Sequence, residues 1–284
     1  MKKRTLGKTG EQLSMVGFGG ILVSGVTPEE SSEYVTYAIE ERGINYFDVA
    51  PTYGNAEEML GPALEPYRDQ VFLACKTGKR TAEEAEQELH QSLEYLRTDH
   101  FDLYQLHAVK TEEDVNTILG PGGALETFVK AREQGLVRFL GFSAHSEEAA
   151  LALMDAFSFD TILFPFNWAC WHKGKFGPRT LKVANEKEMG VLALKTLAKR
   201  RWGEDEERRW SKTWYSPVDT YEEAALAVRF TFSKPIDAGP CPGHIELLTW
   251  MCDAADQFTP ITEQEDAQLK EWSQDLDVIF PQDD

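Results

Sequence analysis

The sequence of 284 residues is poor in cysteine and in basic residues, and each shortage argues against particular kinds of site or partner. Its four cysteines, Cys75, Cys170, Cys241 and Cys252, lie far apart without the paired spacing of a metal site, so reduced thiols are expected. Lys and Arg number 29 against 48 Asp and Glu, which gives a net charge of -19. This balance argues against nucleic acid or an anionic membrane surface as a partner, because both bind basic faces.

Two sequence patterns are also absent. No apolar run approaches the length of a membrane span, and no apolar signal core follows the basic residues 2–4. We therefore expect a cytoplasmic protein that does not interact with membranes. No Gly-x-Gly-x-x-Gly sequence opens a strand–turn–helix unit, so a Rossmann dinucleotide-binding unit is not predicted.

Ionisable side chains follow three successive predicted strands. The strand at residues 43–47 runs into Asp48, the strand at 71–75 into Lys76, and the strand at 101–106 into His107. The sequence FDVAPTYG at residues 47–54 breaks the chain into a loop that carries Tyr53. In a barrel of parallel strands all these ends lie on one rim, where such enzymes place their chemistry.

These four side chains suit the polarisation of a carbonyl oxygen. A phenol has a pKa of about 10 and is a poor proton donor at neutral pH, but an adjacent ammonium lowers that pKa. Lys76 would supply the cation, Asp48 would keep it charged, and neutral His107 would donate a second hydrogen bond. Taken singly, a strand-end lysine is usually a solvated charge and a lone histidine a half-buried structural residue.

The chain resembles the aldo-keto reductase family from about residue 4 to about residue 245. The resemblance is carried by the sequences RTLGKTG at residues 4–10 and VGFGG at 16–20, by FDVAPTYG, by Lys76 and His107, and by LGFS at 140–143. It implies an oxidoreductase that transfers hydride from NAD(P)H to an aldehyde or ketone. Asp48, Tyr53, Lys76 and His107 would be the catalytic residues.

The length and the alternation of strands and helices predict one α/β domain over residues 1–284, a (β/α)₈ TIM barrel. Helices are expected at 56–65, 81–96 and 124–134, with further strands at 136–142, 161–166, 190–195 and 235–239. The resemblance implies that a hairpin at residues 4–14 caps the bottom of the barrel. Residues 108–123 are expected to be a long connection that overhangs the substrate or lies on the surface. An acidic helix at 262–279 is expected to pack outside the barrel.

The cofactor residues follow from the resemblance. Ser143 and Asn167 match positions that hold the nicotinamide carboxamide, although Asn167 could instead cap the following turn. Leu194 stands where several relatives place an aromatic ring, Lys195 follows it, and Pro-Gly at 242–243 matches part of the phosphate turn. His145 stands where many relatives have Asn or Phe, and its role stays open.

The turn after the eighth strand lacks the cations that select the adenosine 2′-phosphate. NADP(H) is favoured by the resemblance and NAD(H) is not excluded; backbone amides at the helix start, including that of Gly243, could still receive a phosphate. The charged stretch at residues 199–209 is expected either to clamp a pyrophosphate with its Lys and Arg side chains or to be a charge-balanced excursion.

Five tryptophans follow the sixth and seventh strands, at positions 168, 171, 202, 210 and 214. They favour an apolar or aromatic carbonyl substrate, although a lid packed on itself would have the same composition. Cys170 and His172 are too few ligands for a metal site, so no metal is predicted. The alternative to a reductase is a regulatory protein with the same fold that binds the cofactor but turns over little.

Overall fold

The computed structural model describes residues 1–281, and an eight-stranded parallel sheet forms its centre. The strand order is β12-β3-β4-β5-β6-β7-β8-β9. A parallel bridge between Leu192 of β9 and Ala238, just before β12, closes the sheet into a barrel. The barrel strands are β3 (Val16–Gly19), β4 (Tyr46–Asp48), β5 (Phe72–Thr77), β6 (Phe101–Val109), β7 (Val137–Ala144), β8 (Thr161–Pro165), β9 (Gly190–Leu194) and β12 (Gly239–Pro240).

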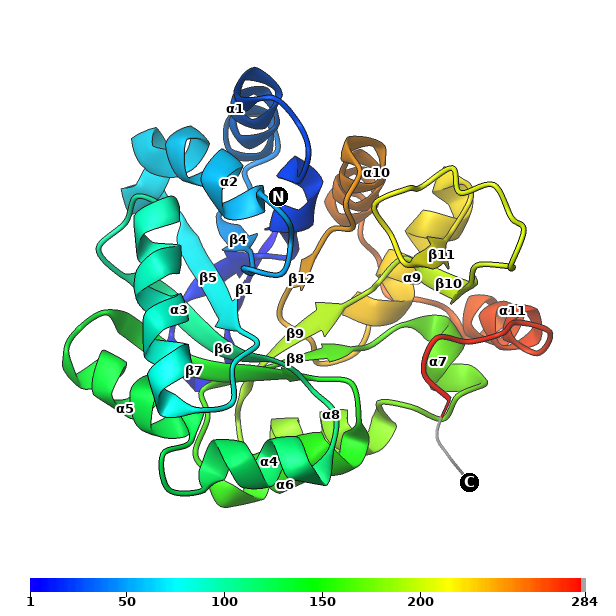
Figure 1. The fold of residues 1–284 in the computed structure, drawn as a ribbon. Helices are drawn as coiled ribbons and strands as arrows, with labels where there is room; N and C mark the ends of the chain where they lie inside the picture. Colours follow the sequence, from blue (N-terminus) through cyan, green and yellow to red (C-terminus); the bar gives the residue numbers. More distant parts are fainter. Residues whose placement is uncertain (282–284) are drawn as a thin grey trace.

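Helices surround the strands (Figure 1), so the predicted (β/α)₈ barrel is confirmed. They are α1 (Pro28–Thr36), α2 (Ala56–Leu64), α3 (Ala82–Tyr95), α4 (Glu112–Leu119), α5 (Ala124–Glu133), α6 (Glu147–Ala156), α7 (Trp168–His172), α8 (Pro178–Glu186), α9 (Tyr221–Phe232), α10 (Ile245–Asp256) and α11 (Glu263–Ser273). Among the described residues, no helix combines the length and the apolar composition that crossing a lipid bilayer requires.

The connection predicted at residues 108–123 contains helix α4, which the sequence analysis missed. Thr111 accepts a hydrogen bond from the Asp114 backbone amide, and the Asp114 side chain accepts one from the Thr111 amide. This reciprocal capping box is a sequence-visible helix start. The same device, formed by Thr27 and Glu30, starts α1. The long loop is therefore two short connections on either side of a helix.

An N-terminal hairpin closes the bottom of the barrel, as expected. Its antiparallel strands are β1 (Lys3–Thr5) and β2 (Gln12–Ser14). Leu6 and Leu13 are fully buried, and they pack against side chains that point into the barrel, including Tyr46 and Leu103. Burying apolar side chains here removes water from the lower half of the barrel interior.

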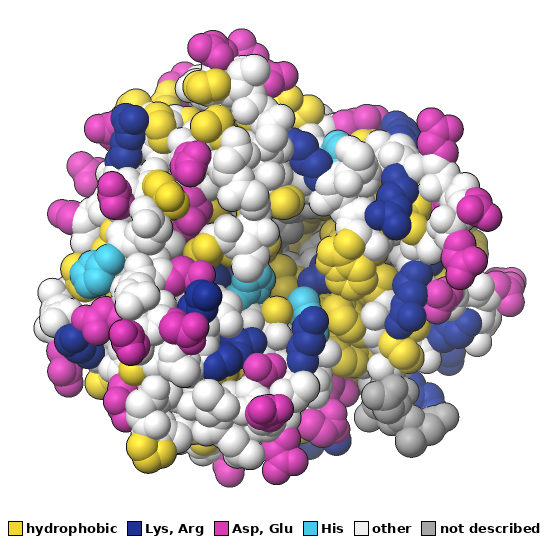
Figure 2. All heavy atoms as spheres, viewed as in Figure 1, with side chains coloured by type: hydrophobic (Ala, Val, Ile, Leu, Met, Phe, Trp, Pro, Cys, Tyr) yellow, Lys and Arg dark blue, Asp and Glu magenta, His cyan; other side chains and the backbone are white. Residues whose placement is uncertain are grey.

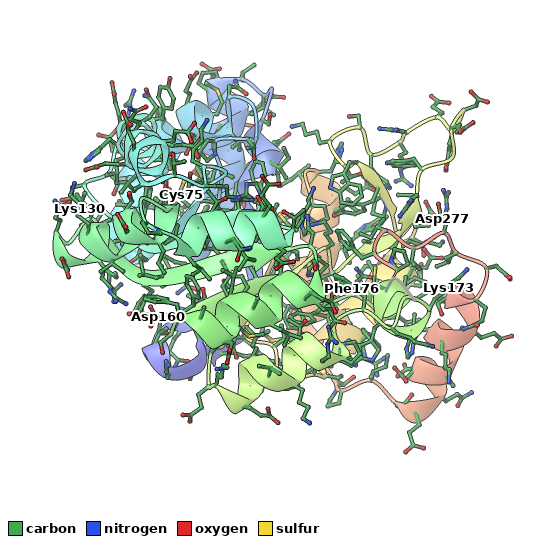
Figure 3. All side chains as sticks on the ribbon, turned by 60° about the horizontal axis from the view of Figure 1, so that its bottom comes forward. Cys75, Lys130, Asp160, Lys173, Phe176 and Asp277 are labelled. Atoms are coloured by element: carbon green, nitrogen blue, oxygen red, sulfur yellow. The ribbon has the colours of Figure 1, made fainter. Side chains whose placement is uncertain are left out.

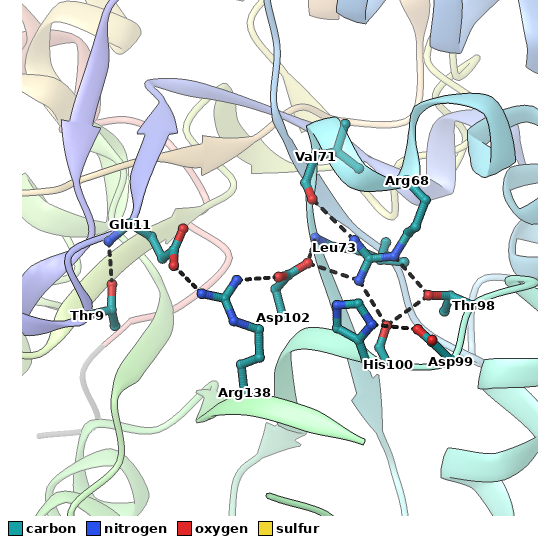
Figure 4. A network of polar contacts seen from close by, with 10 residues as sticks. All are labelled: Thr9, Glu11, Arg68, Val71, Leu73, Thr98, Asp99, His100, Asp102 and Arg138. Carbon is teal, nitrogen blue, oxygen red and sulfur yellow. Dashed lines mark hydrogen bonds and ion pairs between the residues drawn. The ribbon is translucent and has the colours of Figure 1, made fainter. Parts of the chain in front are cut away.

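A charged network joins the hairpin to the barrel wall (Figure 4). Arg138 of β7 donates hydrogen bonds to Glu11 of the hairpin and to Asp102 Oδ1 of β6, the latter at 2.6 Å. The other carboxylate oxygen, Asp102 Oδ2, accepts from the Leu73 amide at 2.9 Å and lies 3.1 Å from an Arg68 nitrogen. Asp102 is 4% exposed, so its charge depends on these partners rather than on water.

The charged excursion after β9 is more ordered than expected. Strands β10 (Ala198–Arg201) and β11 (Tyr215–Pro217) pair antiparallel outside the barrel sheet and hold residues 202–214 between them. Figure 1 shows this hairpin beside α9, between α10 and α11. Residues 202–214 are thus held at both ends by paired strands, and β10 begins four residues after the end of β9.

The C-terminal segment returns to the barrel rim. The predicted helix at 262–279 ends at Ser273, and the chain after it runs past the segment that follows α7 (Figures 1 and 3). Lys173 Nζ donates to the Gln274 carbonyl at 2.7 Å, and the Phe176 and Phe280 rings stack at 5.2 Å. Phe280 also lies 4.9 Å from the His145 ring. The helix packs against α7 and α9 outside the barrel, as expected, but it ends earlier than predicted, and Phe280 beyond the predicted stretch contacts His145.

Replacing Asp102 tests the network below the barrel. Asp102→Ala removes the carboxylate that joins Arg68 to Arg138 and leaves Arg138 with Glu11 alone. We expect a loss of about 3 kcal/mol in the free energy of unfolding. Urea denaturation measures it. Asp155→Ala, which removes an exposed carboxylate from α6, should change stability by less than about 0.5 kcal/mol. Equal effects of the two variants would contradict a structural role for the network.

Candidate active site

The four predicted catalytic side chains lie together at the open rim. Asp48 is the last residue of β4, Lys76 lies one residue before the end of β5, and His107 lies near the end of β6. Tyr53 is in the loop after β4. A cavity of about 360 Å³ opens at this point, and Asp48, Tyr53 and His107 line it. Figure 2 shows a central hollow bordered by histidine, Lys or Arg, and apolar side chains.

A buried ion pair forms the floor of the site. Lys76 is fully buried, and its ammonium donates hydrogen bonds to Asp48 Oδ1 and, at 3.1 Å, to the Val49 carbonyl. Asp48 Oδ2 accepts from Gln105 Nε2 at 3.0 Å and from the Tyr46 hydroxyl at 3.2 Å. Burial opposes the charge on Lys76, but Asp48, together with Tyr53 and Cys75, outweighs burial and the pKa of Lys76 is raised. The ammonium is therefore charged at neutral pH.

Tyr53 is half-buried between the ion pair and the histidine. Its ring centroid lies 5.1 Å from Lys76 Nζ and 5.8 Å from the centre of the His107 ring, which it meets edge-on. Burial raises the pKa of Tyr53, and the opposing effect of Lys76 only reduces that rise. The expected net lowering was therefore wrong, because burial disfavours the phenolate more than Lys76 favours it. The phenol keeps its proton at neutral pH.

His107 is neutral in this environment. Burial, followed by the charges of Lys76 and Lys195, lowers the pKa of His107 to about 3. Its Nδ1 lies 3.3 Å from the Thr52 hydroxyl, and Arg80 fixes its backbone carbonyl with a hydrogen bond of 2.9 Å. When Thr52 donates to Nδ1, the ring proton is on Nε2, which is then a hydrogen-bond donor.

The two polar residues predicted to hold the carboxamide are engaged with the protein itself. Ser143 Oγ accepts from the Ala108 amide at 2.7 Å. Asn167 Oδ1 accepts from the Cys170 amide at 2.9 Å and so caps α7, as the alternative interpretation held. Asn167 Nδ2 is buried without a hydrogen-bond partner in the part of the chain that the structure describes. Neither residue is among those that line the cavity.

The other predicted cofactor residues do line the cavity. Leu194 and Lys195 border it from the end of β9, and Gly243 borders it from the turn before α10. A Cβ atom at Gly243 would come within 2.8 Å of Lys212 Cβ and 3.4 Å of a methyl carbon of Ile21. Only a residue without a side chain fits between the two walls without displacing them.

Four of the five basic residues proposed as pyrophosphate clamps, Lys199, Arg200, Arg201 and Arg209, are paired with carboxylates instead. Lys199 Nζ lies 3.1 Å from Asp219 and 2.8 Å from Glu223, and Arg200 makes two hydrogen bonds of 2.6 Å to Glu206. None of the cations at 199–201 or at 208–209 is among the residues that line the cavity. The charge-balanced interpretation of this stretch therefore describes it better.

Lys212 is a cavity residue that the sequence analysis missed. It lies beside Gly243, its Nζ donates to the Leu22 carbonyl at 2.8 Å, and its amide donates to His244 Nε2 at 3.1 Å. No spacing pattern marks it, because its position depends on how residues 202–214 fold. Gln105 and Tyr46 had a usable signal: each lies two residues before a predicted site residue on the same strand, and such residues share a face.

The predicted aromatic wall is smaller than its composition suggested. Trp214, which is 54% exposed, and Tyr215 line the cavity. The Trp210 ring packs edge-on against Trp250, and the Trp171 ring against Phe230. The remaining two also lie outside the cavity lining: Trp202 donates to a backbone carbonyl, and Trp168 is buried in the core. Most of the tryptophans therefore pack within the protein.

Comparisons with known proteins give one consistent result. The sequence model described as the aldo/keto reductase family matches residues 15–244. The chain is 32% identical over 158 residues to an uncharacterized oxidoreductase of Bacillus subtilis, covering 51% of this chain and 49% of that protein. It is 31% identical over 189 residues to an aldo-keto reductase of the same organism, covering 59% and 54%. The matches span about half the length of these curated relatives.

A solved structure extends the similarity to the whole fold. The holo form of an aldo-keto reductase from Bacillus halodurans superposes with a TM-score of 0.75 over 98% of each chain, at 21% sequence identity. At this level of identity the match concerns the fold.

Acid should destabilise the protein partly through His107. Its pKa is about 3 in the folded state, against an ordinary value of 6.5 for a histidine side chain. As the pH falls below 6.5, His107 therefore binds a proton in the unfolded chain but not in the folded protein. The contribution of the neutral ring to the free energy of unfolding is fully present above the unfolded pKa, and it decreases as the pH falls toward the folded pKa. His107→Gln should lose less stability than the wild type between about pH 7 and about pH 5. Urea unfolding at both pH values measures this; equal losses would contradict the neutral ring.

Proposed function

The chain belongs to the aldo/keto reductase family, and we propose that it is an NAD(P)H-dependent oxidoreductase that reduces the carbonyl group of an aldehyde or ketone. The observation that carries the proposal is the position of Tyr53. Its protonated phenol lies in the cavity wall between a buried ammonium and a neutral imidazole. We further propose that residues 1–284 act as one domain.

The proton donor in this proposal is Tyr53. A carbonyl oxygen gains negative charge as its carbon is reduced, so it needs a proton and hydrogen-bond donors. Tyr53 would give up its proton, and the resulting phenolate would be stabilised by Lys76, whose charge is maintained by Asp48. His107 Nε2–H would donate to the same oxygen and orient the substrate. The raised pKa of Tyr53 is compatible with this role because the acid must hold its proton until the reaction begins.

The cavity has features that fit a nicotinamide dinucleotide. A bound nicotinamide would supply the hydride. Leu194 offers an apolar surface for one face of a ring. Asn167 does not line the cavity, but its Nδ2 is a buried donor without a partner among the described residues. Ser143 would contribute after exchanging its bond with the Ala108 amide. At the other end, Gly243 lines the cavity just before α10, whose first amides and positive dipole end favour a phosphate.

NADP(H) is our proposed cofactor, and Lys212 is the residue that we assign to its phosphates. Lys212 is the cation that borders the cavity beside Gly243. In the described residues its ammonium is bonded to a carbonyl, that of Leu22, rather than to a carboxylate. A neutral partner leaves the positive charge available to an anion. The charges of Lys199 and Arg200 are not available to a phosphate in this way, because Glu223 and Glu206 already pair with them.

Removing one hydroxyl tests the proton donor. Tyr53→Phe should lower the rate of aldehyde reduction by roughly 10²- to 10⁴-fold, which is typical of losing a general acid. Tyr215→Phe is a matched control because it removes a second phenol from the same cavity wall, and it should cost less than about 10-fold. Steady-state assays with a broad panel of carbonyl compounds provide the rates. Full activity of Tyr53→Phe would exclude this role.

Lys76→Met adds a second readout to this test. It should also reduce the rate, but it leaves the buried carboxylate of Asp48 without its cation. The free energy of unfolding should therefore fall by about 3 kcal/mol. Tyr53→Phe leaves the ion pair intact and should not have this effect. Wild-type protein that binds the cofactor but reduces no compound in the panel would favour the regulatory alternative.

Charge removal at Lys212 tests the cofactor assignment. Lys212→Met should weaken NADPH binding by roughly 10- to 100-fold, as expected for losing a hydrogen bond between charged groups. Lys199→Met, which removes a lysine already paired with Glu223, should weaken it far less. Quenching of tryptophan fluorescence on titration with NADPH and with NADH gives both affinities. Equal effects of the two variants would contradict the assignment to Lys212.

A further inference from the structure

Lys195 is a cation in the cavity wall that the proposed chemistry does not use. It follows β9 in a left-handed backbone conformation with a φ of 60°, which is uncommon for a residue with a side chain. Its Nζ lies 3.1 Å from His145 Nε2, and the Trp214 and Phe280 rings lie at 5.7 and 5.5 Å. Within residues 1–281 no carboxylate lies within ion-pair distance of this ammonium, so its charge is not neutralised there.

The barrel order shows which part of the cavity Lys195 serves. The strands run β12-β3-…-β7-β8-β9 around the closed sheet, so β9 has β12, with the phosphate turn after it, on one side and β8 on the other. Lys195 reaches across the end of β8 to His145, which directly follows β7. Its ammonium is therefore directed away from Gly243 and Lys212, toward the side of the cavity that holds His107.

This side of the cavity carries an excess of positive charge. Lys76, Lys110 and Lys195 all act on the His107 imidazole and lower its pKa. Asp48 is the carboxylate among the described cavity-lining residues, and it is already bonded to Lys76. Burial, together with Lys76 and Lys110, lowers the pKa of Lys195 to about 7, although the Cys170 thiol opposes this shift. A bound anion would relieve the repulsion among these groups.

We propose that Lys195 binds a carboxylate of the substrate, so that the carbonyl compounds reduced here are those that also carry a carboxylate group. This inference rests on the proposed reductase function. His145 is the positioning residue: burial and Lys195 lower its pKa to about 2, so its neutral Nε2 accepts from the ammonium without repelling it. The Trp214 and Phe280 rings lie beside the ammonium and would pack against the body of the substrate.

A pair of substrates that differ only in charge tests the proposal. The wild type should reduce para-carboxybenzaldehyde with a higher kcat/KM than its methyl ester. In Lys195→Met the ratio of the two kcat/KM values should fall by roughly 10- to 100-fold, as expected for losing a charged hydrogen bond, mainly through the KM of the acid. Lys195→Arg should restore most of the ratio. Lys234→Met, which removes a lysine that lies over the Phe230 and Trp171 rings, should keep it.

The pH dependence supplies a readout that a structural role would not move. The groups around the Lys195 ammonium are His145 after β7, Lys110 after β6, Lys76 on β5 and Cys170 on α7. Only the protonated amine attracts a carboxylate, so the acid-to-ester ratio should be high below the pKa of Lys195 and fall as the pH rises through it. In Lys195→Arg the guanidinium stays charged, and the ratio should stay level.

Binding measurements separate failure of this inference from failure of the proposed function. Calorimetric titration with terephthalate, which carries no carbonyl to reduce, reports the anion site alone. Terephthalate binding that is lost in Lys195→Met, in a protein that reduces no carbonyl compound, would retain the anion site and refute the reductase. Reduction of both aldehydes at an unchanged ratio in Lys195→Met would refute the assignment. So would weaker NADPH binding in that variant with the ratio unchanged, because Lys195 would then serve the cofactor.

Discussion

The ion pair between Lys76 and Asp48 is the interaction on which the rest of the site depends. Both groups are buried on neighbouring strands, where an unpaired charge would be costly. The pair is therefore surrounded by donors that satisfy the second carboxylate oxygen, those of Gln105 and Tyr46. These partners come from strand positions that face into the barrel. The hairpin below keeps water away from them, which makes the cation a fixed neighbour for Tyr53.

The part of the site that follows from strand geometry could be predicted from the sequence. Parallel strands end at one rim, so Asp48, Lys76 and His107 had to meet once the strands were identified. The direction of the Tyr53 pKa could not be predicted in the same way. It depends on whether burial or the nearby ammonium has the larger effect, and burial is decided by loops and packing that the local sequence does not reveal.

Loops account for most of what the sequence left open. Helix α4 begins with a capping box formed by Thr111 and Asp114, which is a signal that residues 111–114 carry in the sequence. The excursion between β10 and β11 had no such signal. Lys199 and Lys212 look alike in sequence, yet one is held by Glu223 and the other lines the cavity. Their difference arises from contacts between distant segments, which no local pattern records.

The distribution of charge shows why the net value of -19 misleads about the site. Acidic side chains dominate the helix starts, where they complement the helix dipoles of α1, α4 and α11. The barrel rim instead collects Lys76, Lys195 and Lys212 around a cavity to which Asp48 contributes the carboxylate. At physiological salt, charges separated by more than about 8 Å are largely screened where they are exposed to solvent. An anion entering the cavity would therefore respond to the nearby lysines more than to the distant acidic surface.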